Sequence, residues 1–155
     1  MRKDLIQKYS EGYKALLDAV YEVSAEMWDW KPADNKWSVR EIVIHVADAE
    51  VNGYLRLRKA LAESGSSVTT YEQDAWANSL KYSEMKMDDH LELFRLLRKI
   101  NTALLRSMDD IDFVKHINHP ERGMMTIDEW LQTYVEHIDV HVNQIIRNNS
   151  EWGNK

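Results

Sequence analysis

The chain contains no cysteine among its 155 residues. This absence excludes disulfide bonds, cysteine-ligated zinc, iron–sulfur clusters and thiol nucleophiles. Proline and glycine are scarce as well, with two and five copies. Because both residues interrupt helices, their scarcity favours long helices. No window approaches the roughly 18 apolar residues of a membrane-spanning helix, so we expect no membrane partner.

Positive charge is also limited, because 20 Lys and Arg face 26 Asp and Glu and give a net charge of −6. Proteins that bind nucleic acids usually cluster their basic residues, and no such cluster occurs here, so we expect no nucleic-acid partner. The residues Met1–Asp4 lead directly into a charged, periodic segment that lacks the apolar core of a signal peptide. We therefore expect a cytoplasmic protein.

Apolar residues recur every three or four positions in four long segments, which is the pattern of amphipathic helices. The predicted helices cover residues 3–23, 38–65, 88–109 and 126–148. Two of them open with a capping box, Ser38-Val39-Arg40-Glu41 and Thr126-Ile127-Asp128-Glu129. The predicted fold is all-α, a four-helix bundle. The length favours one domain spanning residues 1–155, which can bury a core without a structural metal, so a bound metal would serve function.

The segments between these helices are predicted to be loops. Residues 66–86 form a long connection between helices two and three, with a short helix around Gln73–Ser79. His116–Gly123, which contains Pro120, is predicted to be a loop, and no clear strand is expected. The apolar stripe of the third helix is predicted to include Ile100, and the polar tail from Asn148 is expected to fray.

Three histidines lie at the margins of the predicted apolar faces. His137 and His141 are four residues apart, which places both imidazoles on one face of the last helix. His45 lies at the flank of the second helix. Three imidazoles that converge could bind a cation and leave positions open for water or substrate. Each histidine taken alone is more often a hydrogen-bonded, half-buried residue. The segment lacks the Glu that follows the first His in zincin metalloproteases, so that class is not supported.

Further residues could support such a site. Histidine ligands usually donate their second N–H to a carboxylate or carbonyl, and Glu41 and Asp48 lie one turn either side of His45. Glu41 already has a capping role, and Asp48 is equally consistent with a surface charge. Gln144, one turn beyond His141, either touches the site or packs between helices.

The aromatic residues and the remaining polar residues are more consistent with structural roles. Four aromatic side chains could wall a pocket, although packing in the core is the more common role for each: Tyr71, Trp76, Trp130 and Tyr134. Glu50 falls within the apolar stripe of the second helix, so we expect a buried carboxylate paired with Arg or Tyr rather than a catalytic group. His90, His116 and His119 are predicted to be peripheral.

Two segments resemble the DinB/YfiT-type family of metal-binding four-helix bundles. Trp37–Glu50 resembles the family's W-S-x-x-E-I-x-x-H pattern with its trailing acidic position, at the start of the second helix. His137–Ile145 resembles the H-x-x-x-H-x-x-Q-I pattern of the last helix. The order and separation of the two motifs also match, so the resemblance covers nearly the whole chain.

The resemblance implies a divalent metal ion, nickel or zinc, bound by His45, His137 and His141, and it implies a homodimer. Characterised members of the family are implied to be transferases or isomerases that use low-molecular-weight thiols such as bacillithiol or mycothiol, and others are taken to be hydrolases. The leading hypothesis is therefore a metal-dependent S-transferase or hydrolase acting on a small molecule. A non-catalytic, stress-related bundle that binds a metal or small ligand, and a structural dimer with unused histidines, remain as alternatives.

Overall fold

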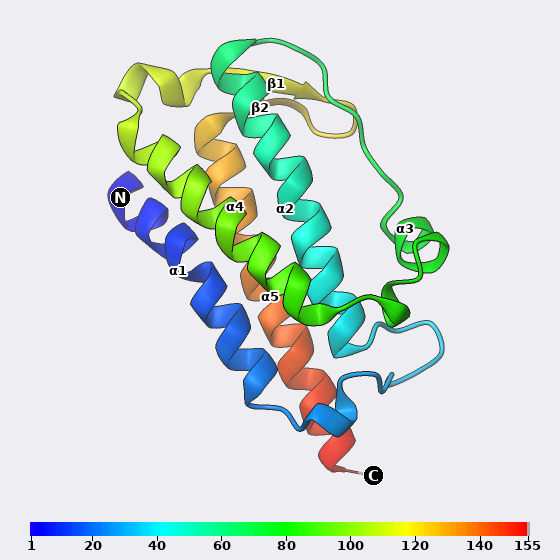
Figure 1. The fold of residues 1–155 in the computed structure, drawn as a ribbon. Helices are drawn as coiled ribbons and strands as arrows, with labels where there is room; N and C mark the ends of the chain where they lie inside the picture. Colours follow the sequence, from blue (N-terminus) through cyan, green and yellow to red (C-terminus); the bar gives the residue numbers. More distant parts are fainter. Residues whose placement is uncertain (155) are drawn as a thin grey trace.

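The computed structural model describes residues 1–154 and has five α-helices and one two-stranded sheet within them (Figure 1). The helices are α1 (Arg2–Tyr21), α2 (Val39–Ala62), α3 (Gln73–Ser79), α4 (Met87–Ser107) and α5 (Ile127–Gly153). The strands are β1 (His116–His119) and β2 (Gly123–Thr126), and short 3-10 helices occupy Ala25–Met27, Tyr82–Glu84 and Asp110–Val114. The four long helices form the predicted bundle. None of the described helices is long and apolar enough to cross a membrane.

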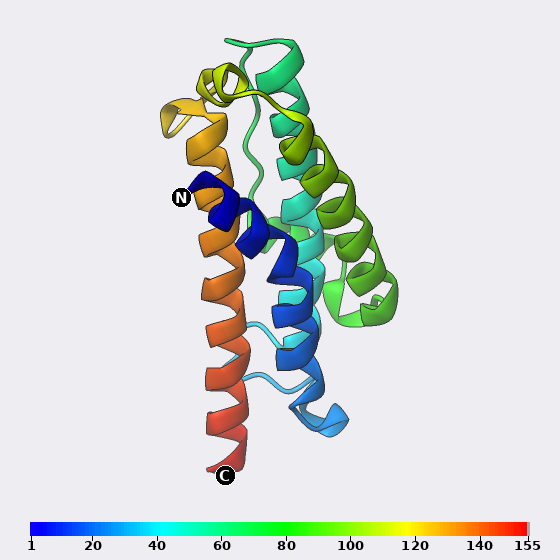
Figure 2. The same ribbon diagram turned by 90° about the vertical axis from the view of Figure 1, so that its left-hand side faces the viewer.

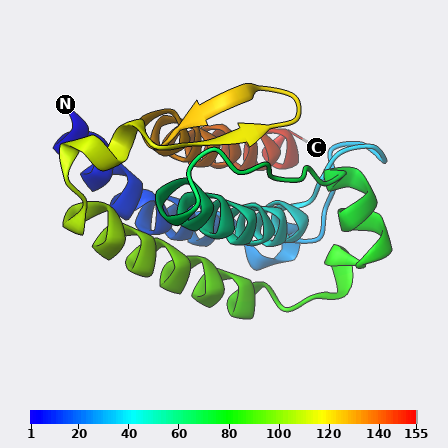
Figure 3. The same ribbon diagram turned by 90° about the horizontal axis from the view of Figure 1, so that it is seen from above.

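The long connection between α2 and α4 follows from the direction of these helices. The helices α1 and α5 run in one direction, and α2 and α4 run in the other (Figures 1 and 2). Each of α1 and α2 packs against both α4 and α5 (Figure 3). Because α2 and α4 are parallel, the chain must return along the bundle between them, and residues 63–86 make this crossover. The crossover lies outside α2 and contains α3 at the predicted residues, Gln73–Ser79.

Both predicted capping boxes are present. The hydroxyl of Ser38 accepts a hydrogen bond from the backbone N–H of Glu41, and the Glu41 carboxylate accepts one from the N–H of Ser38. Thr126 and Glu129 form the same reciprocal pair at the start of α5. Each box satisfies two N–H groups that the first helical turn leaves free, so the two helices that contain the histidines begin at fixed residues.

The prediction of a loop at His116–Gly123 was wrong. This segment and the residues after it form an antiparallel hairpin in which His116 pairs with Thr126 and His119 pairs with Gly123. Ser67 in the crossover also bridges to Asn118, and the N–H of Val68 donates to the Asn118 carbonyl at 3.2 Å. The hairpin depends on this tertiary pairing, which a short polar sequence does not reveal.

Two smaller predictions were also wrong. Ile100 is 45% exposed and lies outside the buried stripe of α4. The last helix continues to Gly153 without fraying at Asn148. The reason is that the Asn148 side chain is buried and donates a hydrogen bond to the carbonyl of Trp37 at 3.0 Å, which ties the end of α5 to the start of α2.

A charged network occupies the centre of the bundle. Glu50 on α2 and Arg98 on α4 are fully buried, and their Oε2 and Nη2 atoms are 3.0 Å apart. Arg98 donates to the backbone carbonyls of Tyr9 on α1 and Tyr134 on α5, each at 2.8 Å. The hydroxyl of Tyr9 donates to the second carboxylate oxygen of Glu50. Glu50 is therefore the structural carboxylate, paired with Arg and Tyr, that the sequence predicted.

This network predicts a large loss of stability in Glu50→Gln. The substitution keeps the shape of the side chain but leaves the Arg98 charge buried without its counter-ion. Breaking one partner of a buried pair typically costs 3–5 kcal/mol, so we expect the free energy of unfolding in urea to fall by about 3 kcal/mol.

Asp18→Asn is the matched control, because it removes a carboxylate from an exposed pair between Asp18 and Lys14. Exposed pairs of this kind contribute about 0.5 kcal/mol or less. A loss below about 1 kcal/mol in Glu50→Gln would contradict the role given to the buried pair.

Candidate metal centre

His45, His137 and His141 come together between α2 and α5. The Nε2 atom of His137 lies 3.2 Å from Nε2 of His45 and 3.0 Å from Nε2 of His141. The three ligand nitrogens all lie within 4.8 Å of one another. His45 and His141 are buried, and His137 is partly buried. These rings are positioned by the i, i+4 spacing on α5 and by the start of α2 at Ser38. The structure therefore brings together the three histidines that were candidates in the sequence.

The spacing of the nitrogens fits a first-row divalent metal. Imidazole nitrogens bind zinc at about 2.0–2.1 Å, so two ligands of a tetrahedral ion lie about 3.3 Å apart. The two measured separations are close to that value. Without a cation, the hydrogen-bonding needs of the three Nε2 atoms cannot all be met, because a single N–H would have to serve two acceptors. A cation that accepts all three lone pairs removes this conflict.

Gln144 controls the tautomer of His141. Its Oε1 atom lies 2.8 Å from Nδ1 of His141, and because an amide oxygen only accepts, Nδ1 must donate. The proton of neutral His141 is then on Nδ1, and the lone pair of Nε2 faces the other two histidines. Such hydrogen bonds commonly orient metal-binding histidines. Of the two roles considered for Gln144, contact with the site is the one observed.

Burial keeps these histidines uncharged. Burial, reinforced by the nearby His141, lowers the pKa of His45 from its ordinary value of 6.5 to about 3. Burial is also the main reason why the pKa of His137 lies well below 6.5 and that of His141 is lowered. Neutral imidazoles are the form that binds metals. The cluster is therefore ready to accept a cation at neutral pH.

Trp37 closes one side of the cluster. The centre of its ring lies 4.7 Å from that of His45 and 6.5 Å from that of His141, nearly parallel to the latter. The residue belongs to the motif at the start of α2, but its contact with the histidines could not be inferred from the sequence. It covers part of the cluster and places an intrinsic fluorophore beside it.

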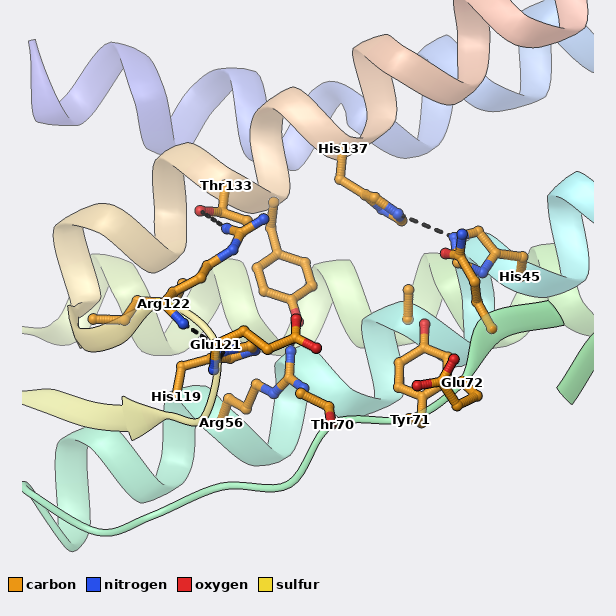
Figure 4. A pocket seen from close by; sticks show the side chains of 14 residues that line it. His45, Arg56, Thr70, Tyr71, Glu72, His119, Glu121, Arg122, Thr133 and His137 are labelled. Atoms are coloured by element: carbon orange, nitrogen blue, oxygen red, sulfur yellow. Dashed lines mark hydrogen bonds between the residues drawn. The ribbon is translucent and has the colours of Figure 1, made fainter. Parts of the chain in front are cut away.

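The cluster borders a pocket of about 400 Å³ that His45 and His137 line at one end (Figure 4). This volume lies within the usual range for small-molecule sites. The walls come from α2, α5, the crossover and the hairpin. The residues that line the pocket are His45, Ala49, Arg56, Thr70, Tyr71, Glu72, Gln73, His119, Glu121, Arg122, Met125, Thr133, Tyr134 and His137.

Tyr134 is a pocket wall, as the sequence allowed, and a glycine makes room for it. The ring of Tyr134 lies over Gly53 on α2, where an added Cβ would come within 2.5 Å of the ring. The ring centres of Tyr134 and His137 are 6.4 Å apart. Tyr71 also lines the pocket, with Trp76 packed against it at 4.4 Å between ring centres.

Other candidate residues lie away from the cluster. Asp48 accepts a hydrogen bond from the hydroxyl of Tyr82, while Nδ1 of His45 is buried without a hydrogen-bond partner among the described residues. Trp130 is fully buried in the core and donates to the Gly53 carbonyl at 3.1 Å. Glu41 keeps its capping role and also binds Lys31 at 2.8 Å. None of these three is placed to orient a ligand.

His119 is not peripheral, contrary to the sequence-based prediction. It is buried and lines the pocket together with Arg56 and Arg122, neither of which the sequence singled out. His119 reaches the pocket because the hairpin forms. Its role could not be predicted, because the sequence analysis did not predict the strand pairing of this hairpin. His90 is partly buried, lies outside the cluster and the pocket, and bonds to the Lys86 carbonyl, so it is peripheral as expected.

A sequence model described as the DinB superfamily matches residues 8–145 of this chain. The chain is 30% identical to a Bacillus subtilis protein named "Putative metal-dependent hydrolase YfiT", over 90% of this chain and 79% of that protein. A relative from Halalkalibacterium halodurans with the same descriptive name is 30% identical, over 72% of this chain and 65% of its own length.

Solved structures show the same fold. The structure of B. subtilis YfiT, titled as a probable metal-dependent hydrolase with an unusual four-helix bundle topology, superposes with a TM-score of 0.90. It is 28% identical and covers 97% of this chain and 87% of YfiT. A DinB-like B. subtilis protein, YjoA, superposes with a TM-score of 0.66 at 14% identity, which supports the fold alone.

The lowered pKa values predict that acid destabilises the metal-free protein. His45 stays neutral in the folded protein down to about pH 3 but protonates near 6.5 when unfolded. The unfolded state therefore binds more protons between these values, and stability is lost as the pH falls through that window. The loss for one such group approaches about 1.4 kcal/mol per pH unit, or about 2 kcal/mol between pH 6.5 and 5.

The measurement compares urea unfolding at pH 7 and pH 5, with EDTA present, for the wild type and His45→Asn. Between pH 7 and pH 5 we expect the free energy of unfolding to fall by about 2 kcal/mol less in the variant than in the wild type. His90→Asn, which changes a histidine outside the cluster, should behave like the wild type. Equal pH dependence in the wild type and His45→Asn would show that His45 titrates normally.

Proposed function

The chain belongs to the DinB superfamily, and from this premise we propose that it is a metal-dependent hydrolase of small molecules whose cation is bound by His45, His137 and His141. The observation that carries the proposal is the convergence of three Nε2 atoms beside a pocket that two of the rings line. The names of the relatives support the same activity. Imidazole ligands favour zinc, nickel, copper or iron over magnesium or calcium, and we propose zinc or nickel.

When bound, the divalent cation supplies Lewis acidity, which polarises a substrate oxygen and lowers the pKa of a water or thiol. Three neutral imidazoles leave its +2 charge undiminished. Gln144 fixes the tautomer and orientation of His141 by their hydrogen bond. Trp37 covers the face of the cluster away from the pocket, so a substrate approaches past Tyr134.

The hydroxyl of Tyr71 is a hydrogen-bond donor in the pocket wall. Burial, opposed by the charge of Arg56, raises the pKa of its hydroxyl to about 12. The hydroxyl therefore stays protonated at neutral pH. We propose that it donates a hydrogen bond to an oxygen of the substrate, a role that requires no change in its own charge.

A thiol S-transferase is the second candidate. A cation bound only by neutral imidazoles favours a thiolate as readily as it activates water, because the undiminished +2 charge lowers the pKa of either ligand. The pocket beside the histidines is large enough for a small thiol and an electrophile. Assays of ester and amide hydrolysis, run beside thiol conjugation to several electrophiles, separate the two activities. Metal binding with neither activity would favour the non-catalytic bundle.

The metal site predicts a graded loss of affinity in two variants. His141→Ala removes a ligand, so we expect metal affinity to fall by more than about a hundredfold with the fold retained. Gln144→Ala removes only the hydrogen bond that orients this ligand, and such changes typically cost 10–100-fold. The order of affinity should be wild type, then Gln144→Ala, then His141→Ala.

Affinity is measured by quenching of Trp37 fluorescence with Ni²⁺ and by metal analysis of protein purified without a His-tag or chelator. Trp37→Phe should lose most of the quenching while keeping the metal. His90→Ala is the matched control, since its ring lies outside the cluster. Wild-type protein without bound metal that also fails to bind added zinc or nickel would refute the proposed function.

The homodimer stays a prediction. Light scattering of the purified protein will test it, and a monomer at micromolar concentration would contradict it.

A further inference from the structure

The end of the pocket away from the three histidines has a different chemical character. Figure 4 shows His45 and His137 at one end and Arg56, His119 and Arg122 at the other. The two arginines and the histidine come from α2, the loop between the hairpin strands and β1. The proposed hydrolysis uses none of them, so their shared position needs its own explanation.

Arg56 is a half-buried cation without a counter-ion. Its guanidinium donates to the carbonyl of Thr69 at 2.9 Å and to the hydroxyl of Tyr134 at 3.4 Å. Both partners are uncharged, and within residues 1–154 no carboxylate oxygen lies within 4.0 Å of it. Half-buried charges are normally paired, because taking a charge out of water is costly. Its remaining N–H groups can therefore bind an anion in the pocket.

His119 contributes a second donor. Its Nδ1 accepts hydrogen bonds from the backbone N–H groups of Glu121 and Arg122, at 3.2 and 3.3 Å. An acceptor at Nδ1 places the proton of the neutral ring on Nε2. The Nε2–H has no hydrogen-bond partner among the described residues, and the ring lines the pocket. Burial, followed by the charges of Arg56 and Arg122, lowers the pKa of His119, so the ring is neutral and keeps this arrangement at pH 7.

Arg122 completes the group, and the nearby carboxylates do not neutralise it. Arg122 donates to the hydroxyl of Thr133 at 3.3 Å and forms no ion pair within 4.0 Å in the described chain. Glu72 and Glu121 also line the pocket, and both are exposed, as Arg122 is. Exposed charges are well screened by water and salt, whereas Arg56 is partly desolvated. The local balance therefore favours a negatively charged ligand group.

We infer that this end of the pocket is an oxyanion subsite, in which Arg56, the Nε2–H of His119 and Arg122 bind a carboxylate or phosphate group of the substrate. The inference rests on the proposed function in one respect, that the bond to be cleaved lies at the histidine end. The substrate class is then a compact molecule with a hydrolysable group at one end and a carboxylate or phosphate at the other. Arg56 determines specificity and takes no part in the chemical step.

The first test uses metal-binding probes with and without a negative charge remote from the metal-binding group. Zinc-loaded protein is titrated calorimetrically with acetohydroxamate, with succinic acid monohydroxamate and with the methyl ester of the latter. We expect the carboxylate compound to bind at least about tenfold more tightly than its neutral ester, as charge-assisted hydrogen bonds to arginine typically allow. Equal binding of the acid and the ester would overturn the inference.

Variants assign the effect to the subsite. Arg56→Gln should abolish the preference for the carboxylate compound, so that this compound binds about as tightly as its methyl ester. Arg147→Gln removes the same charge from an exposed position on α5 and should preserve the preference. A preference that survives in Arg56→Gln, or that disappears equally in Arg147→Gln, would also overturn the inference.

A second test needs no metal and separates this inference from the proposed function. Metal-free protein is titrated with inorganic phosphate and, separately, with acetate, while the side-chain Nε–H signals of the arginines are followed by NMR. The Arg56 signal, assigned by its absence in Arg56→Gln, should shift with anion concentration, and that of Arg147 should not. Failure of acetohydroxamate to bind zinc-loaded protein would count against the metal site alone, whereas an unresponsive Arg56 signal would count against the subsite alone.

Discussion

The buried pair of Glu50 and Arg98 is the interaction on which the rest of the bundle depends. Removing two charges from water costs several kcal/mol for each ion, and this cost is offset only where geometry and additional hydrogen bonds are good. The protein meets most of this condition by using all four long helices, and only Oε2 of Glu50 and Nε of Arg98 lack a hydrogen-bond partner in the described part of the network. Arg98 on α4 binds a carboxylate on α2 and backbone carbonyls on α1 and α5, and Tyr9 on α1 satisfies the second carboxylate oxygen. Gly12 on α1 leaves room for the guanidinium, since an added Cβ would lie 2.8 Å from Nη1.

The position of the candidate metal centre follows from this network. Arg98 binds the carbonyl of Tyr134, which lies one helical turn before His137, and the same guanidinium faces Glu50, little more than one turn beyond His45. The arginine thereby fixes the axial position of α5 relative to α2. A slip of one residue moves a helix by about 1.5 Å along its axis, which is enough to separate the two Nε2 atoms that now lie 3.2 Å apart. The buried ion pair thus sets the register that brings the three histidines together.

The sequence revealed the parts of this arrangement that have a local cause. The capping boxes at Ser38 and Thr126, the helical periodicity and the i, i+4 spacing of His137 and His141 are properties of short segments, and the structure agrees with each. The convergence of His45 with that pair required the family resemblance, because no local pattern relates α2 to α5. The hairpin and the subsite at Arg56 and His119 could not be predicted. They depend on the crossover pairing with β1, and in the sequence these residues look like ordinary surface charges and a loop histidine.

The two ends of the pocket are therefore built from different kinds of structure. The histidines sit on long helices that begin at capped residues and are held by the central ion pair, where neutral, buried rings tolerate little change. His119 and Arg122, by contrast, belong to the hairpin, and the loop at Thr69 supports Arg56, so these groups can vary without disturbing the core. Changes in the crossover and the hairpin would alter which molecule reaches the proposed cation site, while the three histidines stay the same. A bundle of this design could present one candidate metal site to different molecules, which explains why the fold alone does not specify the substrate.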